Sequence, residues 1–281
     1  MTADMTADHA TAEARDENER VSAAVRRPPR PFWLGLAGIA AVLGVHEAVS
    51  RLELLRPEFF PPVSVIAPAL LELLPTAQLW EQILGTLQGW GVGLALAAVL
   101  AVPLGMLIGS FEAVRRMLRV IVEFMRPIPS VALFPAALLL LGITTGMKVS
   151  LVAFAAFWPI LFQAIYGVQD VDPATKETAR AYGLGPVARF WRIIVPSTSA
   201  YIATGLRISS AIALILTVTV ELLTNLTGLG NAIGSARTAG QFPQMYALIA
   251  LTGILGWLLN GTFERVEARL LHWHPSQREG T

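Results

Sequence analysis

The chain has no cysteine, and this absence removes several chemistries at once. Disulfides, thiolate nucleophiles and cysteine-ligated metals are all excluded. The histidines are not spaced as metal ligands beside a supporting carboxylate, and no nucleophile–base pair favours an enzyme. The sequence also lacks Gly-x4-Gly-Lys-Ser/Thr, the motif of ATP-hydrolysing P-loops. The nearest stretch, GITTGMKVS at residues 142–150, predicts only a short turn on the outer side.

Charge is scarce as well. Only 15% of the 281 residues are charged, 54% are hydrophobic, and the mean hydropathy is +0.58. Soluble domains contain about a quarter charged residues, so this composition indicates contact with lipid. The net charge of +1 favours neither nucleic acid nor an acidic partner. We therefore predict an all-α integral membrane protein.

Six apolar runs are long enough to cross a bilayer, which takes about 20 residues per helix. They are residues 32–49, 89–109, 118–142, 148–168, 199–223 and 244–263. The prediction is about six transmembrane helices in a membrane domain over residues 32–271. The flanking residues 1–31 and 272–281 are polar, and the first of these segments predicts a disordered tail. The stretch 60–74 predicts a short interfacial helix, because it is apolar but too short to span.

Lysine and arginine are unevenly divided between the two sides of this predicted bundle. Fifteen fall in segments on the side of the N-terminus, four fall on the opposite side, and Arg126 and Arg207 lie in or beside spans. The four on the opposite side are Arg51, Arg56, Lys148 and Arg237. Because positively charged loops remain in the cytoplasm, we predict that both termini are cytoplasmic.

The loop between the fourth and fifth runs contains signals for a helix, a tight turn and a second helix. Asp172 is an N-cap candidate, Pro173 suits the first helical position, and Gly183 suits a left-handed C-cap. A second helix is predicted to begin at Pro186 and return to the membrane. These caps are also compatible with a simple well-capped connector.

The spacing within the loop resembles the EAA signature of the membrane subunits of ABC importers. That signature reads Glu-Ala-Ala, three residues, Gly, nine residues, Ile, any residue, Leu, Pro. This sequence departs from it at Thr178 and Val195, which are mild changes in size. The matching positions are Glu177, Ala179, Gly183, Ile193 and Pro196.

Further stretches extend the resemblance over most of residues 60–271, with a family core at about 75–265. RPIPSVALFP begins at Arg126, and TGLG follows Glu221 in the fifth run. Together these motifs are similar to the nitrate, sulfonate, taurine and bicarbonate group of binding-protein-dependent permeases. The match also lies between the expected pair of spans and on the predicted cytoplasmic side.

The resemblance implies the fold of a type I ABC importer permease with a cytoplasmic coupling helix. ATP and magnesium would bind to two separate ATPase subunits, and this chain would bind no cofactor. A second permease copy, in a homodimer, and an extracytoplasmic binding protein would complete the importer in the bacterial plasma membrane. The residues implied in ATPase coupling are Glu177, Thr178, Ala179, Arg180, Gly183, Ile193 and Pro196.

The fifth run carries polar residues at helical spacing. Arg207, Ser210, Leu214, Thr217 and Glu221 recur at intervals of three and four, so they lie on one stripe. Charges within a membrane usually face a bundle interior or water, which makes the stripe a candidate substrate path or permease–permease contact. Alternatively, the hydroxyls bond to their own helix and the arginine snorkels or pairs with a neighbouring helix.

The RPIPS stretch predicts a broken helix, because proline removes a backbone donor and clashes with the preceding turn. The residues concerned are Arg126, Pro127 and Pro129. Broken helices survive inside membranes only where protein or a water-filled cavity covers the free backbone groups. A gate or cavity is one hypothesis, and a simple kink at the entry to the third span is the other.

The transported solute implied by the resemblance is small and anionic or zwitterionic, of the sulfonate, taurine or nitrate type. A pyrimidine vitamin precursor carried by the same machinery is an alternative. An ion-coupled secondary carrier is a second alternative, but it would need acidic or histidine relays in several spans. Here the deep ionisable residues are concentrated in the fifth run.

Overall fold

The computed structural model describes residues 32–125 and 128–270, and within these ranges the regular structure is helical throughout. The chain divides into two units, Met1–Val63 and Ser64–Thr281. In the first unit, α2 (Phe32–Arg51) is an apolar helix. The Ser50 hydroxyl donates to the carbonyl of Phe60 at 2.6 Å, which holds the segment after α2 against the last turn of that helix.

The second unit contains the remaining helices of the described ranges. In chain order they are α3 (Val63–Leu73), α4 (Ala77–Ser110), α5 (Glu112–Met125), the 3-10 helix η1 (Ser130–Leu133), α6 (Phe134–Leu141), α7 (Thr145–Gln169), α8 (Pro173–Ala181), α9 (Pro186–Arg189), the π-helix η2 (Phe190–Ile194), α10 (Val195–Leu223), α11 (Leu229–Thr238) and α12 (Phe242–Leu270). The short apolar helix expected within residues 60–74 is α3.

In the described residues, five helices are long and apolar enough to cross a membrane. They correspond to the predicted runs at 32–49, 89–109, 148–168, 199–223 and 244–263, so five of the six predicted spans are confirmed as helices. The second of these is longer than predicted. It begins at Ala77, where the Thr76 hydroxyl caps the helix by accepting from the amide of Leu79 at 3.4 Å.

The prediction of one continuous span over residues 118–142 is wrong. Its first part belongs to α5, which carries basic residues such as Arg116, paired with Glu112 at 2.9 Å. Its second part consists of η1 and α6, which together are too short for a span. Pro129 precedes η1 and Pro135 opens α6, and neither can donate a backbone hydrogen bond to a continuous helix.

Two of the three residues of the predicted break, Arg126 and Pro127, lie outside the described residues. Pro129 is described, and its extended backbone separates α5 from the 3-10 turn that follows. Both hypotheses for this break, the gate and the entry kink, therefore stay predictions.

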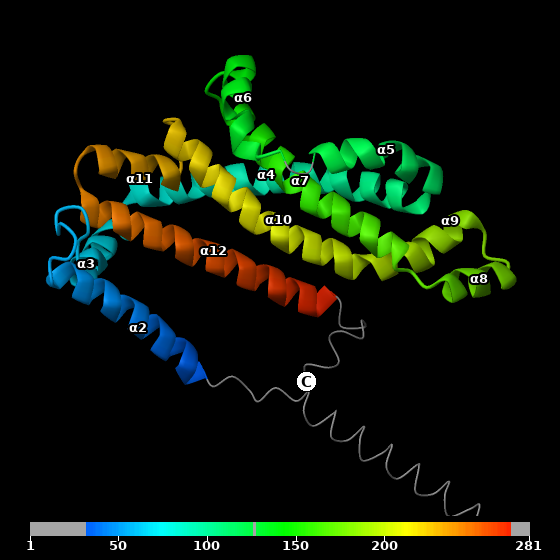
Figure 1. Ribbon diagram of the computed structural model, residues 1–281, viewed down its shortest axis with the longest axis horizontal. Helices are drawn as coiled ribbons and strands as arrows, with labels where there is room; N and C mark the ends of the chain where they lie inside the picture. The colour runs from blue at the N-terminus through cyan, green and yellow to red at the C-terminus, as the bar shows by residue number, and fades with distance from the viewer. Residues whose placement is uncertain (1–31, 126–127, 271–281) are drawn as a thin grey trace, which may run out of the picture. The chain divides into compact units, whose positions relative to one another are not determined.

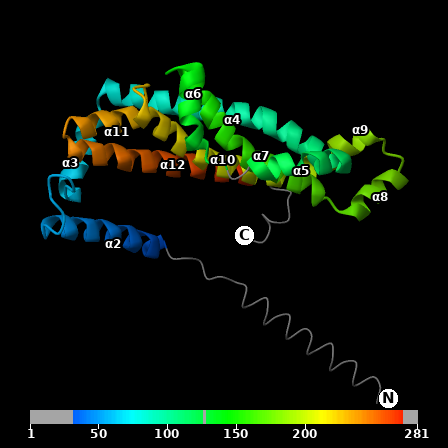
Figure 2. The same cartoon turned by 45° about the horizontal axis from the view of Figure 1, so that its top comes forward.

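The core lies between α4, α7 and α10, which run side by side (Figures 1 and 2). Small residues allow the close approach: a Cβ at Gly105 would lie 2.6 Å from Cβ of Ala164 and 2.8 Å from the carbonyl oxygen of Leu161. The helices α8 and α9 lie at one end of this bundle and α11 lies at the other (Figure 1). Polar side chains are arranged differently at the two ends of this bundle.

Candidate functional site

At the α8 end, the sequence predictions of both helix caps are confirmed. The Asp172 carboxylate accepts from the amide of Ala174 at 2.8 Å, and Pro173 is the first helical residue. Gly183 has φ +74°, a left-handed conformation. The amide of Leu184 donates to the carbonyl of Ala179 at 3.0 Å, as in a Schellman C-cap. The result is a short helix whose two ends are both fixed.

Most of α8 is exposed, so the helix offers a free face. Glu177, Thr178 and Arg180 are exposed, whereas Ala179 points inward and is 4% exposed. A Cβ added at Gly183 would meet nothing within 4 Å. These exposed charged and small side chains can contact another polypeptide without any rearrangement of α8.

The chain passes directly from α8 into the core. A helix begins at Pro186 and continues through the π-helix η2 to Leu223. Ile193 lies in η2 and lines a shallow pocket with Ala179 and Thr178 of α8. Pro196, which has no backbone donor, is the second residue of α10. Only one turn and a continuous helix therefore connect α8 to α10.

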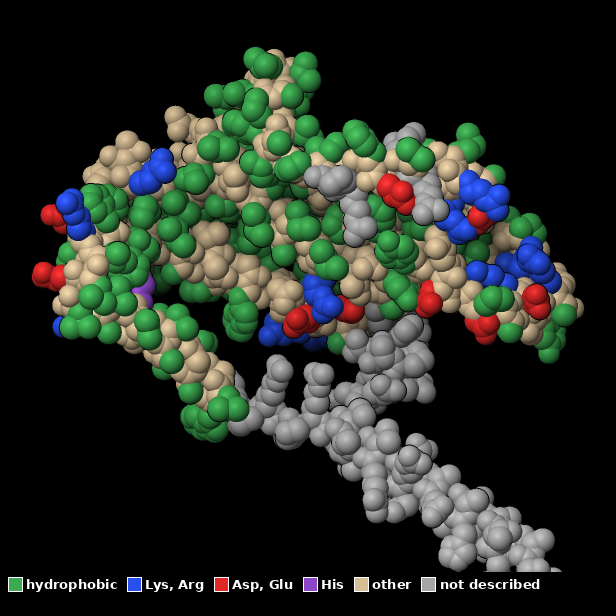
Figure 3. Space-filling model, in the orientation of Figure 1, with side chains coloured by type: hydrophobic (Ala, Val, Ile, Leu, Met, Phe, Trp, Pro, Cys, Tyr) green, Lys and Arg blue, Asp and Glu red, His purple; other side chains and the backbone are tan. Residues whose placement is uncertain are grey.

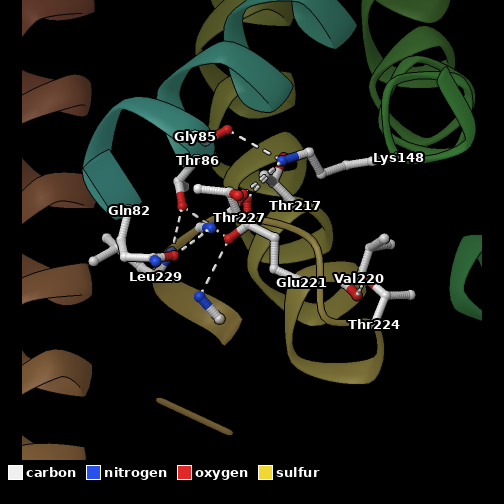
Figure 4. Close-up of polar contacts among 12 residues, drawn as sticks. Gln82, Gly85, Thr86, Lys148, Thr217, Val220, Glu221, Thr224, Thr227 and Leu229 are labelled. Atoms are coloured by element: carbon white, nitrogen blue, oxygen red, sulfur yellow. Dashed lines mark hydrogen bonds and ion pairs between the residues drawn. The ribbon is translucent and has the colours of Figure 1, made fainter. Parts of the chain in front are cut away.

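At the opposite end of the core, Lys148 and Glu221 form a buried ion pair between α7 and α10 (Figure 4). Lys148 Nζ donates to Glu221 Oε1 at 3.0 Å. It also donates to the carbonyl oxygens of Gly85, at 3.1 Å, and Thr227, at 3.2 Å, so its three donors all have partners. The Thr86 hydroxyl donates to Glu221 Oε2 at 2.8 Å. Each charge is thus compensated by hydrogen bonds as well as by its ionic partner.

The same cluster satisfies the first amides of α11. The amide of Leu229 donates to the Thr86 hydroxyl at 2.8 Å, and the amide of Gly230 donates to Glu221 Oε2 at 3.2 Å. The first amides of a helix have no partner within that helix, and an anionic group near them is favourable. The cluster therefore joins α11 to α4, α7 and α10.

Glycines make the space for this cluster. A Cβ at Gly228 would overlap the carboxylate of Glu221, and a Cβ at Gly89 would lie 2.7 Å from Cε of Lys148. Neither neighbour can move freely, because both side chains are held by hydrogen bonds on several sides.

We predict that Gly228→Ala destabilises the chain by about 1–3 kcal/mol or more, the cost of overpacking a filled interior. Gly91→Ala is the matched control, because a Cβ there meets nothing within 4 Å and alanine favours a helix. Thermal unfolding of the detergent-solubilised chain, followed by tryptophan fluorescence, compares the two. An unchanged midpoint for Gly228→Ala would contradict this packing.

The structure divides the predicted polar stripe of α10 into two parts. Arg207 and Ser210 line a cavity of about 450 Å³ with residues of α12. Thr217 and Glu221 are fully buried within the chain. The Thr217 hydroxyl donates to the carbonyl of Ala213 at 2.7 Å, a bond to its own helix.

Arg207 has a partner on a neighbouring helix. Its Nη1 lies 3.5 Å from Glu267 Oε2 of α12, and its side chain remains 36% exposed. The arginine therefore combines an ion pair with access to the cavity.

Sequence reasoning counted Lys148 among the basic residues of the outer side and predicted a short turn over residues 142–150, but in the structure only residues 142–144 precede the helix. The side chain of Thr144 accepts from the amide of Met147 at 3.1 Å, so α7 begins at Thr145 and Lys148 lies in its first turn, buried. The signal that could have found the pair was the presence of one lysine and one glutamate inside apolar runs. Intramembrane charges usually pair with each other.

These features define a class: a multi-pass helical membrane subunit with a capped surface helix between two spans. The chain belongs to the family of binding-protein-dependent transport system inner membrane components, whose model matches residues 101–271.

Three known transport proteins are similar to this chain. The taurine transport system permease protein TauC of Escherichia coli (strain K12) is 29% identical over 250 residues, 87% of this chain and 91% of that protein. The nitrate import permease protein NrtB of Leptolyngbya laminosa is 29% identical over 193 residues, 69% of each chain. A chain of the inward-facing methionine ABC transporter MetNI superposes with a TM-score of 0.60 at 18% identity, covering 68% of this chain and 95% of that chain. The structural match to MetNI shows that this chain shares its fold.

The chain is therefore a permease subunit of an ABC importer and a multi-pass protein of the inner membrane. Family membership implies an ATPase subunit, which is a separate polypeptide, and a solute-binding protein as partners. It also identifies the chain as a transport subunit without enzymatic activity of its own, and it replaces the alternative of an ion-coupled secondary carrier.

Proposed function

We propose that α8 is the coupling helix, through which a partner ATPase drives uptake of a small anionic or zwitterionic solute of the sulfonate, taurine or nitrate type. The observation that carries this proposal is the connection of an exposed, doubly capped helix to α10 by a single turn. A capped helix transmits displacement because its ends do not fray. ATP and magnesium bind to the ATPase in this scheme, and this chain converts the movement into opening of the path.

The coupling residues take different roles in this scheme. Glu177, Thr178 and Arg180 are exposed and contact the ATPase, whereas the inward-facing Ala179 packs α8 on the chain. Gly183 sets the angle between α8 and the following helix through its left-handed backbone. Ile193 and Pro196, at the start of the returning helix, receive the displacement.

The substrate class rests on the relatives and on one side chain. TauC is named for taurine, which carries a sulfonate, and NrtB is named for nitrate. Arg207 lines the cavity beside α12 and can attract an anion. We propose that Arg207 and Ser210 lie on the path, and that Thr217 and Glu221 support it from the interior.

A deletion strain complemented with this chain tests the substrate class. Uptake of labelled taurine or another sulfonate, or of nitrate, is expected to depend on the chain, on its ATPase and on its binding protein. Uptake of a labelled pyrimidine vitamin precursor alone, with none of these solutes, would contradict the proposed substrate class and leave the coupling proposal intact.

We predict that Arg207→Gln raises the anion concentration for half-maximal uptake by about tenfold or more, because a hydrogen bond to a charged group contributes about 1.5–3 kcal/mol. Arg207→Lys retains the charge and should retain most uptake. Arg237→Gln, on an exposed arginine of α11, is the control for loss of a cation elsewhere. Full-rate uptake by Arg207→Gln would remove this arginine from the path.

The assembly proposed is a homodimer of this chain with two ATPases and an extracytoplasmic binding protein. Both termini then lie in the cytoplasm with α8, as the distribution of lysine and arginine predicts. Two differently tagged copies of the chain should co-purify from one membrane. Failure of the tags to co-purify would point to a second, different permease.

A further inference from the structure

The ends of α4, α8, α9 and η2 enclose a groove of about 740 Å³, and two of its lining residues, Arg180 and Ile193, also belong to the proposed coupling set. Its walls are mostly apolar, and they include Leu107, Phe111 and Trp191, which are each about half exposed or more. Its volume lies within the range of ligand pockets, about 300–1,000 Å³. Apolar walls at the ends of two membrane-spanning helices are accessible to an acyl chain.

The charge in this groove has one sign. Lys176, Arg180 and Arg189 line it, and the described residues contribute no carboxylate to its lining. None of the three forms an ion pair with a described carboxylate. Basic side chains gather at this end of the molecule, around α8 and α9 (Figure 3). The groove is therefore complementary to an anion.

Two of these cations have unused hydrogen-bonding capacity. Nε of Arg189 is buried and has no partner among the described residues. Nζ of Lys176 donates to the carbonyl of Val168 at 3.4 Å, which leaves two of its three donors. A buried polar atom without a partner requires an explanation, and contact with a bound anion would supply one.

We propose that this groove binds an anionic phospholipid, with the phosphate at Lys176 and Arg189 and an acyl chain beside Trp191. Basic pockets next to membrane helices bind acidic headgroups, and only an amphipathic anion uses the cations and the apolar walls together. A free phosphate would leave the apolar walls uncovered. The bound lipid ties α8 to the end of α4.

Quenching by brominated lipid tests this directly, because bromine on an acyl chain quenches a nearby tryptophan. The full chain is placed in nanodiscs with brominated phosphatidylglycerol or brominated phosphatidylcholine, and the Trp191 signal is taken as the difference from Trp191→Phe. We expect the phosphatidylglycerol to associate preferentially, by about fivefold for each contributing cation. Lys176→Gln with Arg189→Gln should remove this preference, and Arg189→Lys should retain it.

Arg192→Gln is the matched control, since Arg192 lies on the same helix, is exposed and does not line the groove. Equal quenching by the two lipids, or a preference that survives the double variant, would overturn the proposal. Removal of the preference by inorganic phosphate at millimolar concentration would overturn it in favour of a free-anion site. Loss of Trp191 quenching by both lipids when the ATPase subunits are bound would assign the groove to the ATPase instead.

Discussion

Replacement of Lys148 by methionine should destabilise the folded chain by about 3–5 kcal/mol, because it leaves Glu221 buried without its ionic partner. Methionine fills similar space, so the loss reports on charge and hydrogen bonds rather than on a cavity. The carbonyls of Gly85 and Thr227 lose their donor in the same step. The measurement is the thermal unfolding midpoint of the solubilised chain, together with the yield of complex with the ATPase.

The control for this prediction is Thr219→Val, on the same helix as Glu221. The Thr219 hydroxyl donates only to the carbonyl of Ile215 in its own helix, at 2.7 Å, and the side chain is part of the cavity lining. Its loss should shift the midpoint little. A stable, well-assembled Lys148→Met chain would contradict the assignment of this pair as a structural anchor.

The charge-reversed variant, Lys148→Glu with Glu221→Lys, is not expected to restore stability. The surrounding backbone fixes the polarity: carbonyls of Gly85 and Thr227 face the lysine, and the amide of Gly230 faces the glutamate. A reversed pair would direct a carboxylate at two carbonyls. Recovery of the wild-type midpoint would mean that the attraction between the two charges matters more than these hydrogen bonds.

Gly183→Val should abolish most ATP-driven uptake while the membrane bundle still folds. A β-branched residue at φ +74° is strained, and such backbone strain costs about 1–3 kcal/mol. Because a Cβ there meets nothing within 4 Å, the expected change is a shift of α8 relative to α10 rather than a clash in the core. Uptake and ATPase activity in proteoliposomes, at equal amounts of complex, measure the effect.

Two further variants serve as controls for Gly183→Val. Gly183→Asn should keep much of the uptake, since asparagine tolerates the left-handed conformation. Gly185→Ala should be neutral, because Gly185 has φ −64° and open space around it. Undiminished uptake by Gly183→Val would show that the angle at this turn has no part in coupling.

The coupling loop was predictable from sequence because its signals are local. An N-cap, a proline and a glycine determine the helix within a dozen residues, and Asp172, Pro173 and Gly183 occupy the places expected. The apolar runs were predictable for the same reason, since length and hydropathy define them. The prediction for the third run failed because it treated the apolar stretch as one helix. Pro129 and Pro135 interrupt that stretch.

The buried cluster was not predictable, because it joins residues far apart in the chain. Thr86, Lys148 and Glu221 come from three helices, and only their packing brings them together. Helical spacing put Arg207 and Glu221 on one stripe of α10. It could not show which neighbouring helix covers each turn, so it could not separate the cavity from the interior.

Site-specific crosslinking at Thr178 tests the central claim most directly, and the absence of cysteine from the chain makes a single introduced thiol unique. Thr178→Cys on α8 and Thr238→Cys at the end of α11 are both exposed positions, at opposite ends of the bundle. After labelling with a thiol-reactive photocrosslinker, Thr178→Cys should crosslink to the ATPase subunit and Thr238→Cys should not. An importer that remains active and assembled, yet gives no ATPase crosslink from Thr178→Cys, would contradict the assignment of α8 as the coupling helix.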